Sequence, residues 1–169
     1  MPMKPRQIRI DGDLAYIPLT QGCEAVIDMS DLALVVTANW HVRSDGPRKY
    51  AARNLPKDIN GFRKHALLHR VICGAPDGCE VDHIDGNGLN NCRSNLRLCN
   101  KSENQANRKV SRLSTTGLKG VSPYKSVWRA RISKNGRRYY LGYHKTPDAA
   151  HQAYCQASAE FHGQFGRVV

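Results

Sequence analysis

Long hydrophobic runs are missing from this chain of 169 residues. No apolar stretch approaches the roughly 20 residues that a helix needs to cross a bilayer. The opening residues, MPMKPRQIRIDGD, also lack the apolar segment of a secretory signal. We therefore expect a cytoplasmic protein without membrane contact, whose hydrophobic content of 40% suffices for one modest core or two small ones.

Cysteine is present but never in C-x-x-C pairs: the six cysteines are at positions 23, 73, 79, 92, 99 and 155. Without a secretory context we expect reduced thiols rather than disulfides. Cys73, Cys79, Cys92 and Cys99 flank or fall within the segment 81–108, and four thiolates can hold a structural zinc ion. Their irregular spacing favours a packing role, so a structural zinc site is not expected.

Acidic residues are absent between Glu103 and Asp148. The whole chain carries 26 Lys and Arg against 14 Asp and Glu, a formal net charge of +12. Such an excess is typical of proteins that bind the phosphate backbone of nucleic acid, and a solvated basic face is the alternative interpretation. The basic residues of the acid-free segment are Arg108, Lys109, Arg112, Lys119, Lys125, Arg129, Arg131, Lys134, Arg137, Arg138 and Lys145.

The first 72 residues predict short strands and turns. RQIRI, LAYIPL and EAVID are strand candidates, and Ser30 is expected to cap a short helix through DLALVV. The segment NWHVRSDGPRKYAAR predicts a hairpin around its Ser-Asp-Gly-Pro turn. KHALLHRVI, residues 64–72, lacks strict alternation, and we favour a helix there over a buried strand.

Residues 117–169 predict a small sheet with a helix on one face. KNG forms a tight turn between two strand-like runs, VWRARIS and RRYYLG. Thr146 and Pro147 suit the start of a helix and Gly163 its end. Alternation places Trp128, Ala130, Ile132, Tyr139 and Leu141 inward and Arg129, Arg131, Ser133, Arg138 and Tyr140 outward. The polar segment before this unit predicts a linker at 109–116.

The segment VDHIDGNGLNNCRSNLRLCNKSENQANR, residues 81–108, concentrates polar side chains. It predicts a strand in CEVDHI, a turn at DGNG, a returning strand in NLRLC and a helix with Ser102 as a possible cap. This order would bring Asn104 beside Asp82. Asp82 offers the hard oxygen that Mg²⁺ or Mn²⁺ prefers, and His83 can accept a proton near neutral pH. Asn87, Asn90 and Asn91 are interpreted as turn residues.

This combination of D-H-x-D-G-N, N-L and S-E-N resembles the HNH nuclease motif of the strand-strand-helix metal fold. It is especially similar to the variant in phage-encoded homing endonucleases, in which asparagine replaces the final histidine. The resemblance implies that His83 is the general base and that Asp82 and Asn104 bind the metal. It also implies that Asn95 fixes the loop and orients His83. A cytoplasmic setting would then be that of a bacterium or of a phage-infected host.

Two flanking segments extend the resemblance. LHRVI, residues 68–72, resembles the Leu-His-Arg segment that packs beside the active site in the same phage nucleases, which makes His69 and Arg70 further candidates. A structural role for His69 is the alternative.

The C-terminal unit resembles the DNA-binding domain of plant ethylene-response factors in KGV, WRARI, YYLGYHKTPDAAHQAY and HGQFGR. That domain reads DNA with its sheet, which implies DNA contacts for Arg129, Arg131, Arg138 and Tyr140. Ser122 and Tyr124 depart from the plant pattern, so the plant target site is not implied.

The sequence therefore predicts an α+β DNA endonuclease. N-terminal strands and a ββα-metal HNH core occupy residues 1–108, a linker follows at 109–116, and a three-stranded sheet with one helix occupies 117–169. The partner is double-stranded DNA and the cofactor Mg²⁺ or Mn²⁺. A single site predicts nicking by a monomer, whereas a double-strand break would require a dimer or two successive events. An inactive DNA-binding regulator and an RNA-binding or structural nucleic-acid protein are the alternatives.

Overall fold

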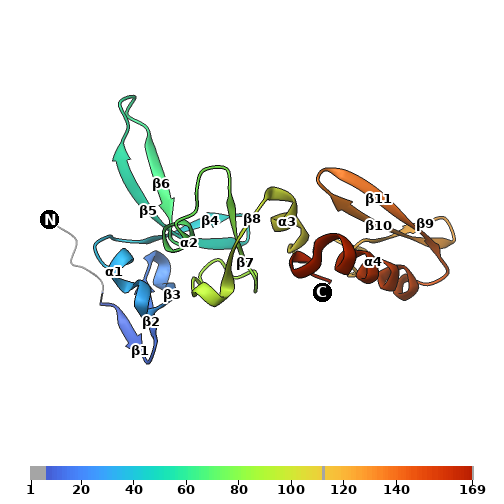
Figure 1. The fold of residues 1–169 in the computed structure, drawn as a ribbon, viewed down its shortest axis with the longest axis horizontal. Helices are drawn as coiled ribbons and strands as arrows, with labels where there is room; N and C mark the ends of the chain where they lie inside the picture. Colours follow the sequence, from blue (N-terminus) through green and yellow to red (C-terminus); the bar gives the residue numbers. More distant parts are fainter. Residues whose placement is uncertain (1–6, 112, 169) are drawn as a thin grey trace. The chain divides into compact units, whose positions relative to one another are not determined.

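The computed structural model describes residues 7–111 and 113–168 as an α+β protein (Figure 1). It divides into two compact units, the first ending at Leu98 and the second beginning at Cys99. Within the described ranges, no helix is both long and apolar enough to cross a membrane. Arg6 of the first predicted strand and Arg112 of the basic segment lie outside the described residues.

Two three-stranded antiparallel sheets and a two-stranded sheet build the first unit, with the last residue of β8 at its boundary. The sheets are β1 (Arg9–Asp11), β2 (Leu14–Pro18) and β3 (Glu24–Asp28); β4 (His41–Asp45), β5 (Arg48–Lys57) and β6 (Arg63–Leu67); and β7 (Glu80–His83) with β8 (Leu96–Cys99). The helical segments are η1 (Thr20–Gly22), η2 (Met29–Asp31), α1 (Leu32–Val35), α2 (Leu68–Cys73) and η3 (Arg93–Asn95). The predicted strands at 14–19 and 24–28 and the predicted hairpin at 39–53 are confirmed.

One hydrophobic core holds these sheets together. Ile27, Val35 and Leu68 are its largest apolar side chains with almost no exposure. Alternate residues of β2 and β3 are buried, as in Ala25 and Ile27, because a strand sends successive side chains to opposite faces. Each buried aliphatic side chain of this size stabilises the fold by about 1.5–3 kcal/mol.

Two local predictions for this unit need correction. Ser30 does not cap a helix, because it lies inside η2 and the residue before α1 is Asp31, whose side chain makes no capping hydrogen bond. The segment 64–72 is not one helix: it is a strand, β6, up to Leu67 and a short helix, α2, from Leu68. The first half is a strand because β6 pairs with β5. This pairing depends on another segment of the chain, so it cannot be read from the hydrophobic pattern of residues 64–72 alone.

The second unit contains a three-stranded antiparallel sheet in the order β11-β10-β9, with a helix packed on it. Its elements are α3 (Lys101–Ala106), β9 (Val121–Tyr124), β10 (Val127–Lys134), β11 (Arg137–His144), α4 (Pro147–His162) and η4 (Gly163–Phe165). Ala130 and Ile132 of β10 pack against Ala150, Tyr154 and Ala157 of α4. The predicted α4 caps are confirmed, since the Thr146 side chain accepts a hydrogen bond from Ala149 N and Gly163 ends the helix.

A β-bulge changes the face that β11 presents. Ala130 is opposite Gly142 but Arg131 is opposite Tyr140, so Leu141 is an extra residue in β11. Because directly opposed side chains share a face, Tyr140 and Tyr143 both lie on the outer face with Arg129 and Arg131.

Candidate active site

The motif segment 81–108 folds as predicted into a strand, a loop, a strand and a helix. Asp82 and His83 are consecutive at the end of β7, and each is only 5% exposed. Asn95 ends η3, directly before β8. Asn104 lies on α3, in the second unit. The cap of α3 is Asn100, not Ser102, because the Asn100 side chain and Glu103 form a reciprocal capping box.

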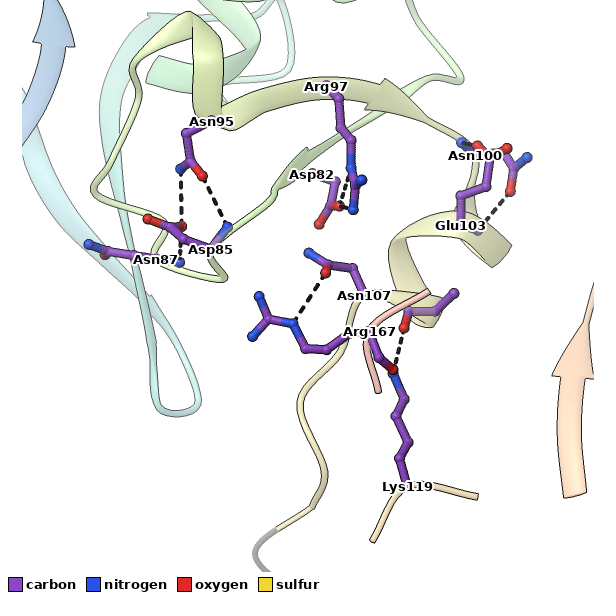
Figure 2. A network of polar contacts seen from close by, with 11 residues as sticks. Asp82, Asp85, Asn87, Asn95, Arg97, Asn100, Glu103, Asn107, Lys119 and Arg167 are labelled. Carbon is purple, nitrogen blue, oxygen red and sulfur yellow. Dashed lines mark hydrogen bonds and ion pairs between the residues drawn. The ribbon is translucent and has the colours of Figure 1, made fainter. Parts of the chain in front are cut away.

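Asn95 closes the loop between β7 and β8 (Figure 2). Its Nδ2 donates to Asp85 Oδ1 at 3.0 Å and to Asn90 O at 2.8 Å, and its Oδ1 accepts from Asp85 N at 3.0 Å. Asp85 also accepts hydrogen bonds from Asn87 N and from Asn90 Nδ2. Burial acts to raise the pKa of Asp85, but these hydrogen bonds from three asparagines outweigh it and leave the pKa below its ordinary value.

His83 is surrounded by polar and aromatic groups. Its Nε2 lies 3.3 Å from Oδ1 of Asn91. Its ring centroid is 4.9 Å from that of His69, edge to face, and 6.0 Å from that of Tyr50. Burial lowers the pKa of His83, against the opposing effects of the Asn91 hydrogen bond and of Asp85 and Asp82. The imidazole is therefore neutral at pH 7 and can accept a proton.

Asn91 differs from the other asparagines of the loop. Asn87 and Asn90 each bond a backbone N–H two residues ahead, as turn asparagines do. Asn91 is instead completely buried, and its backbone N donates to Val26 O at 2.7 Å. Its Nδ2 has no hydrogen-bond partner among the described residues. The interpretation of Asn91 as a turn residue missed its contact with His83, and nothing in an Asn-Asn pair distinguishes the two members.

A neighbouring hairpin completes the surroundings of His83. Tyr50 of β5 places its ring 5.7 Å from His69 and 6.0 Å from His83 between centroids. A Cβ on Gly88 would collide with Lys49 O and the Tyr50 ring. The second glycine of D-G-N-G is thus required by close packing of the loop on β5. Sequence reasoning did not identify Tyr50, because its only local signal is its place in a hairpin.

His69 and Arg70 occupy different surroundings on α2. His69 is 6% exposed, and its Nδ1 has no hydrogen-bond partner within the described chain. Burial, with smaller contributions from His83 and Arg70, lowers the pKa of His69 to about 3. The Arg70 guanidinium donates to the carbonyl oxygens of Ala75, Pro76 and Cys79. Arg70 therefore holds the loop that leads into β7.

Asp82 forms a buried ion pair with Arg97 of β8 (Figure 2). Oδ2 of Asp82 accepts from Arg97 Nε at 2.9 Å and from Nη2 at 2.6 Å. The two side chains are 5% and 14% exposed. Arg97 was not among the predicted site residues, because register between β7 and β8 is what brings it beside Asp82.

Comparison with known proteins places this site in a family. Residues 66–106 match the sequence profile described as HNH endonuclease. Protein 3.8 of Escherichia phage T7 is 37% identical over 108 residues, which cover 62% of this chain and 88% of that protein. The chain belongs to the HNH endonuclease family. An uncharacterized HNH endonuclease, L560, of Acanthamoeba polyphaga mimivirus is 28% identical over 148 residues, covering 86% of this chain and 74% of L560. No solved structure shows a comparable match.

The family match makes this HNH endonuclease an enzyme that acts on DNA, and HNH nucleases generally use divalent metal ions. In the described part of the chain, no three His, Cys, Asp or Glu side chains gather as a metal-binding group. The six cysteines are free thiols. The Asp82 carboxylate offers hard oxygen atoms of the kind that Mg²⁺ or Mn²⁺ prefers. The chemistry of this side chain thus fits a hard divalent ion.

Arginines and tyrosines gather on the outer face of the sheet in the second unit. Arg129 pairs with Tyr143 across the strands, Arg131 with Tyr140, and Arg138 with Ser133. Nη2 of Arg129 donates to Ser122 Oγ at 3.3 Å, and its guanidinium lies 5.5 Å from the centre of the Tyr124 ring. Tyr124 and Tyr143 are 5.0 Å apart between centroids. These two tyrosines were not predicted to face DNA; the bulge at Leu141 brings Tyr143 to this face.

Proposed function

We propose that this HNH endonuclease is a metal-dependent enzyme in which His83 is the general base and Asp82 and Asn104 are the metal ligands. The observation that carries the proposal is the contact between His83 and the buried Asn91. An amide oxygen accepts only, so Nε2 of His83 carries the proton in this contact. Nδ1 then bears the lone pair that can take a proton from the attacking water.

The other polar residues of the loop support this base. Asn95 binds the backbone at Asp85 and Asn90, which fixes the path of the chain directly after His83. Ile84 N also donates to Asn95 O at 2.9 Å. In this proposal Asn95 orients His83 through the backbone, whereas Asn91 acts on the ring itself. His69 and Tyr50 pack against the same ring and limit its rotation.

Arg97 fixes the direction of the Asp82 carboxylate through two hydrogen bonds. When bound, a divalent ion would neutralise the negative charge that builds on the phosphate and the leaving oxygen. Departure of the 3′ oxygen would leave 5′-phosphate ends. Within this scheme Arg70 positions the loop before β7, and His69 excludes water from the buried side of His83.

We propose that residues 117–169 bind DNA through the outer face of their sheet, with Arg129, Arg131, Arg138 and Tyr140 in contact with it. Arginines of this kind pair with guanine edges or with phosphates. The resemblance to the plant ethylene-response-factor domain and the concentration of arginine and tyrosine on one face support this assignment. The segment 109–116 would link this domain to the nuclease. The homing type is a hypothesis from the resemblance to phage enzymes.

Conversion of supercoiled plasmid in Mg²⁺, in Mn²⁺ and in EDTA tests the proposal. We expect relaxed circles that form only with metal and that carry 5′-phosphate at the nick. A linear product formed without a relaxed intermediate would contradict nicking by a monomer and indicate paired sites. Binding of DNA with no metal-dependent product on phage DNA would indicate the alternative, a DNA-binding regulator without nuclease activity.

A further inference from the structure

A groove of about 580 Å³ lies within the second unit. One side is formed by α3 and by described residues that follow it, among them Lys109, Ser114 and Leu118. The other side is formed by β10, β11 and α4, through residues such as Ile132, Gly136 and Tyr154. The groove therefore lies against the helix that carries Asn104 but contains none of the predicted catalytic residues.

The lining of the groove is strongly basic. No aspartate or glutamate is found among the described residues that line it. Its cationic and titratable basic residues are Arg108, Lys109, Lys119, Arg131, Arg138 and His162. Serine hydroxyls at positions 102, 111, 114 and 133 supply further hydrogen-bonding groups. A cavity with this lining attracts an anion that can accept several hydrogen bonds.

Among the described residues, no ion pair neutralises these positive charges. Neither Arg131 nor Arg138 forms an ion pair with a described acidic residue. Burial lowers the pKa of Arg131, and the nearby Arg138 and Arg129 lower it further. Burial likewise lowers the pKa of His162, with help from Lys119 and Lys134. Like charges held this close favour a bound anion, because it relieves their repulsion.

Lys119 lines the groove and joins the end of α3 to Arg167 (Figure 2). Its Nζ donates to Ala106 O, at the end of α3, at 2.5 Å and to Arg167 O at 2.9 Å. Arg167 in turn donates from Nε to Asn107 Oδ1 at 3.3 Å. Asn135 N donates to Ser102 Oγ at 2.9 Å, which ties the β10–β11 turn to α3. A hydrogen bond thus joins the two sides of the groove, between the β10–β11 turn and α3.

We infer that this groove binds the phosphodiester backbone of DNA independently of base sequence. The inference rests on the proposed function and adds a second contact to it. Arg108 and Lys109 line one side of the groove, and Arg131 and Arg138 line the other. In this inference these four residues would contact phosphates of the DNA backbone. Such contacts fix the position of the duplex and carry no sequence information. Arg131 and Arg138 would then contribute to both regions, and Arg129 with Tyr140 on the outer face would remain for contacts with the bases.

The test compares two full-length variants that lose equal charge. Arg108→Gln/Lys109→Gln removes two groove residues, and Arg137→Gln/Lys145→Gln removes two basic residues that do not line the groove. Binding to duplexes of unrelated sequence is measured by fluorescence anisotropy in EDTA over a range of salt concentrations, so that cleavage does not interfere. Circular dichroism confirms that both variants fold.

We expect the groove variant to lose about 10-fold or more in affinity and the salt dependence of log Kd to become less steep by about 2. The loss should be the same for every duplex and larger than in the control variant. Equal losses in both variants, or a loss confined to one sequence, would overturn the inference. Displacement of DNA by inorganic pyrophosphate at about 1 mM would also overturn the inference. It would indicate that the groove binds a small free phosphate compound instead of the DNA backbone. Because binding is measured without catalysis, failure of the groove and failure of the nuclease proposal are distinguishable.

Discussion

Nε2 of His83 and Oδ1 of Asn91 lie 3.3 Å apart, and both residues are buried. This contact selects the tautomer of His83 with its proton on Nε2, since an amide oxygen cannot donate. Asn91 is held in place because it is completely buried and its backbone N donates to Val26 O. Asn95 also closes the same loop through its bond to Asn90 O. The catalytic role proposed for His83 depends on this arrangement.

Asn91→Ala should lower kcat for nicking by roughly 10–100-fold and leave DNA affinity unchanged, because the ring of His83 would lose the group that selects its tautomer. The pH profile should change as well. In the native enzyme we expect the rate to fall only below pH 6.5, because burial lowers the pKa of His83. In the variant this acid limb should shift to lower pH, because the Asn91 hydrogen bond that raises the pKa is lost. Asn87→Ala, on the exposed part of the loop, is the matched control. Wild-type kcat with an unchanged pH profile in Asn91→Ala would contradict the role of this contact.

Arg97→Met should destabilise the fold by roughly 3 kcal/mol, because it leaves the Asp82 carboxylate buried without its ion-pair partner. The double variant Asp82→Asn/Arg97→Met should recover a substantial part of that loss. Urea denaturation of the metal-free protein measures both. Arg9→Met breaks the exposed pair with Glu24, and we expect it to destabilise the fold much less than Arg97→Met does. Equal losses at the two sites would show that burial of the Asp82–Arg97 pair has no energetic importance.

Acid should destabilise the protein through His69. The pKa of His69 is about 3 in the folded chain against an ordinary value of 6.5. Between these values the unfolded chain binds more protons, so stability is full above pH 6.5 and falls as the pH is lowered. Below about pH 5.5 the contribution of His69 is on the order of 1.4 kcal/mol per pH unit. His69→Gln should reduce this slope, as followed by urea denaturation at several pH values. An unchanged slope in His69→Gln would show that His69 is not buried in its neutral form.

Changing either Arg131 or Arg138 to Ala should weaken DNA binding and leave the nuclease chemistry intact. Both side chains share the outer face with Tyr140 and also line the groove, so phosphate contacts would be lost. Nicking by either variant should return to the native rate at high protein concentration, where DNA is saturated. If saturation fails to restore the rate, the proposed division between binding and catalytic regions is wrong.

Local patterns were sufficient for much of the secondary structure. Thr146 and Pro147 start α4, and the alternation in VWRARIS matches the buried Ala130 and Ile132. These features depend on residues close together in the chain. The cap of α3 was misassigned because Asn100 and Ser102 are both good capping residues, and only the reciprocal bonds of Asn100 with Glu103 distinguish them.

The groups around the site that sequence reasoning missed depend on contacts between different elements of the fold. Arg97 reaches Asp82 through strand register, and Tyr50 reaches His83 from another sheet. Asn91 is drawn inward by the carbonyl of Val26. The bulge at Leu141 follows from pairing with β10 and not from a break in the pattern of β11. The motif therefore predicted the family and candidate residues, but not the groups that surround them.

The most direct test of the central claim compares the native chain with His83→Ala in the conversion of supercoiled plasmid at saturating DNA and Mg²⁺. His65→Ala, which changes an exposed histidine on β6, is the matched control. The account predicts metal-dependent relaxed circles with the native chain and with His65→Ala, and a loss of at least about 100-fold in rate with His83→Ala. His83→Ala that nicks at the native rate, with its fold and DNA affinity intact, would contradict the assignment of His83 as the general base.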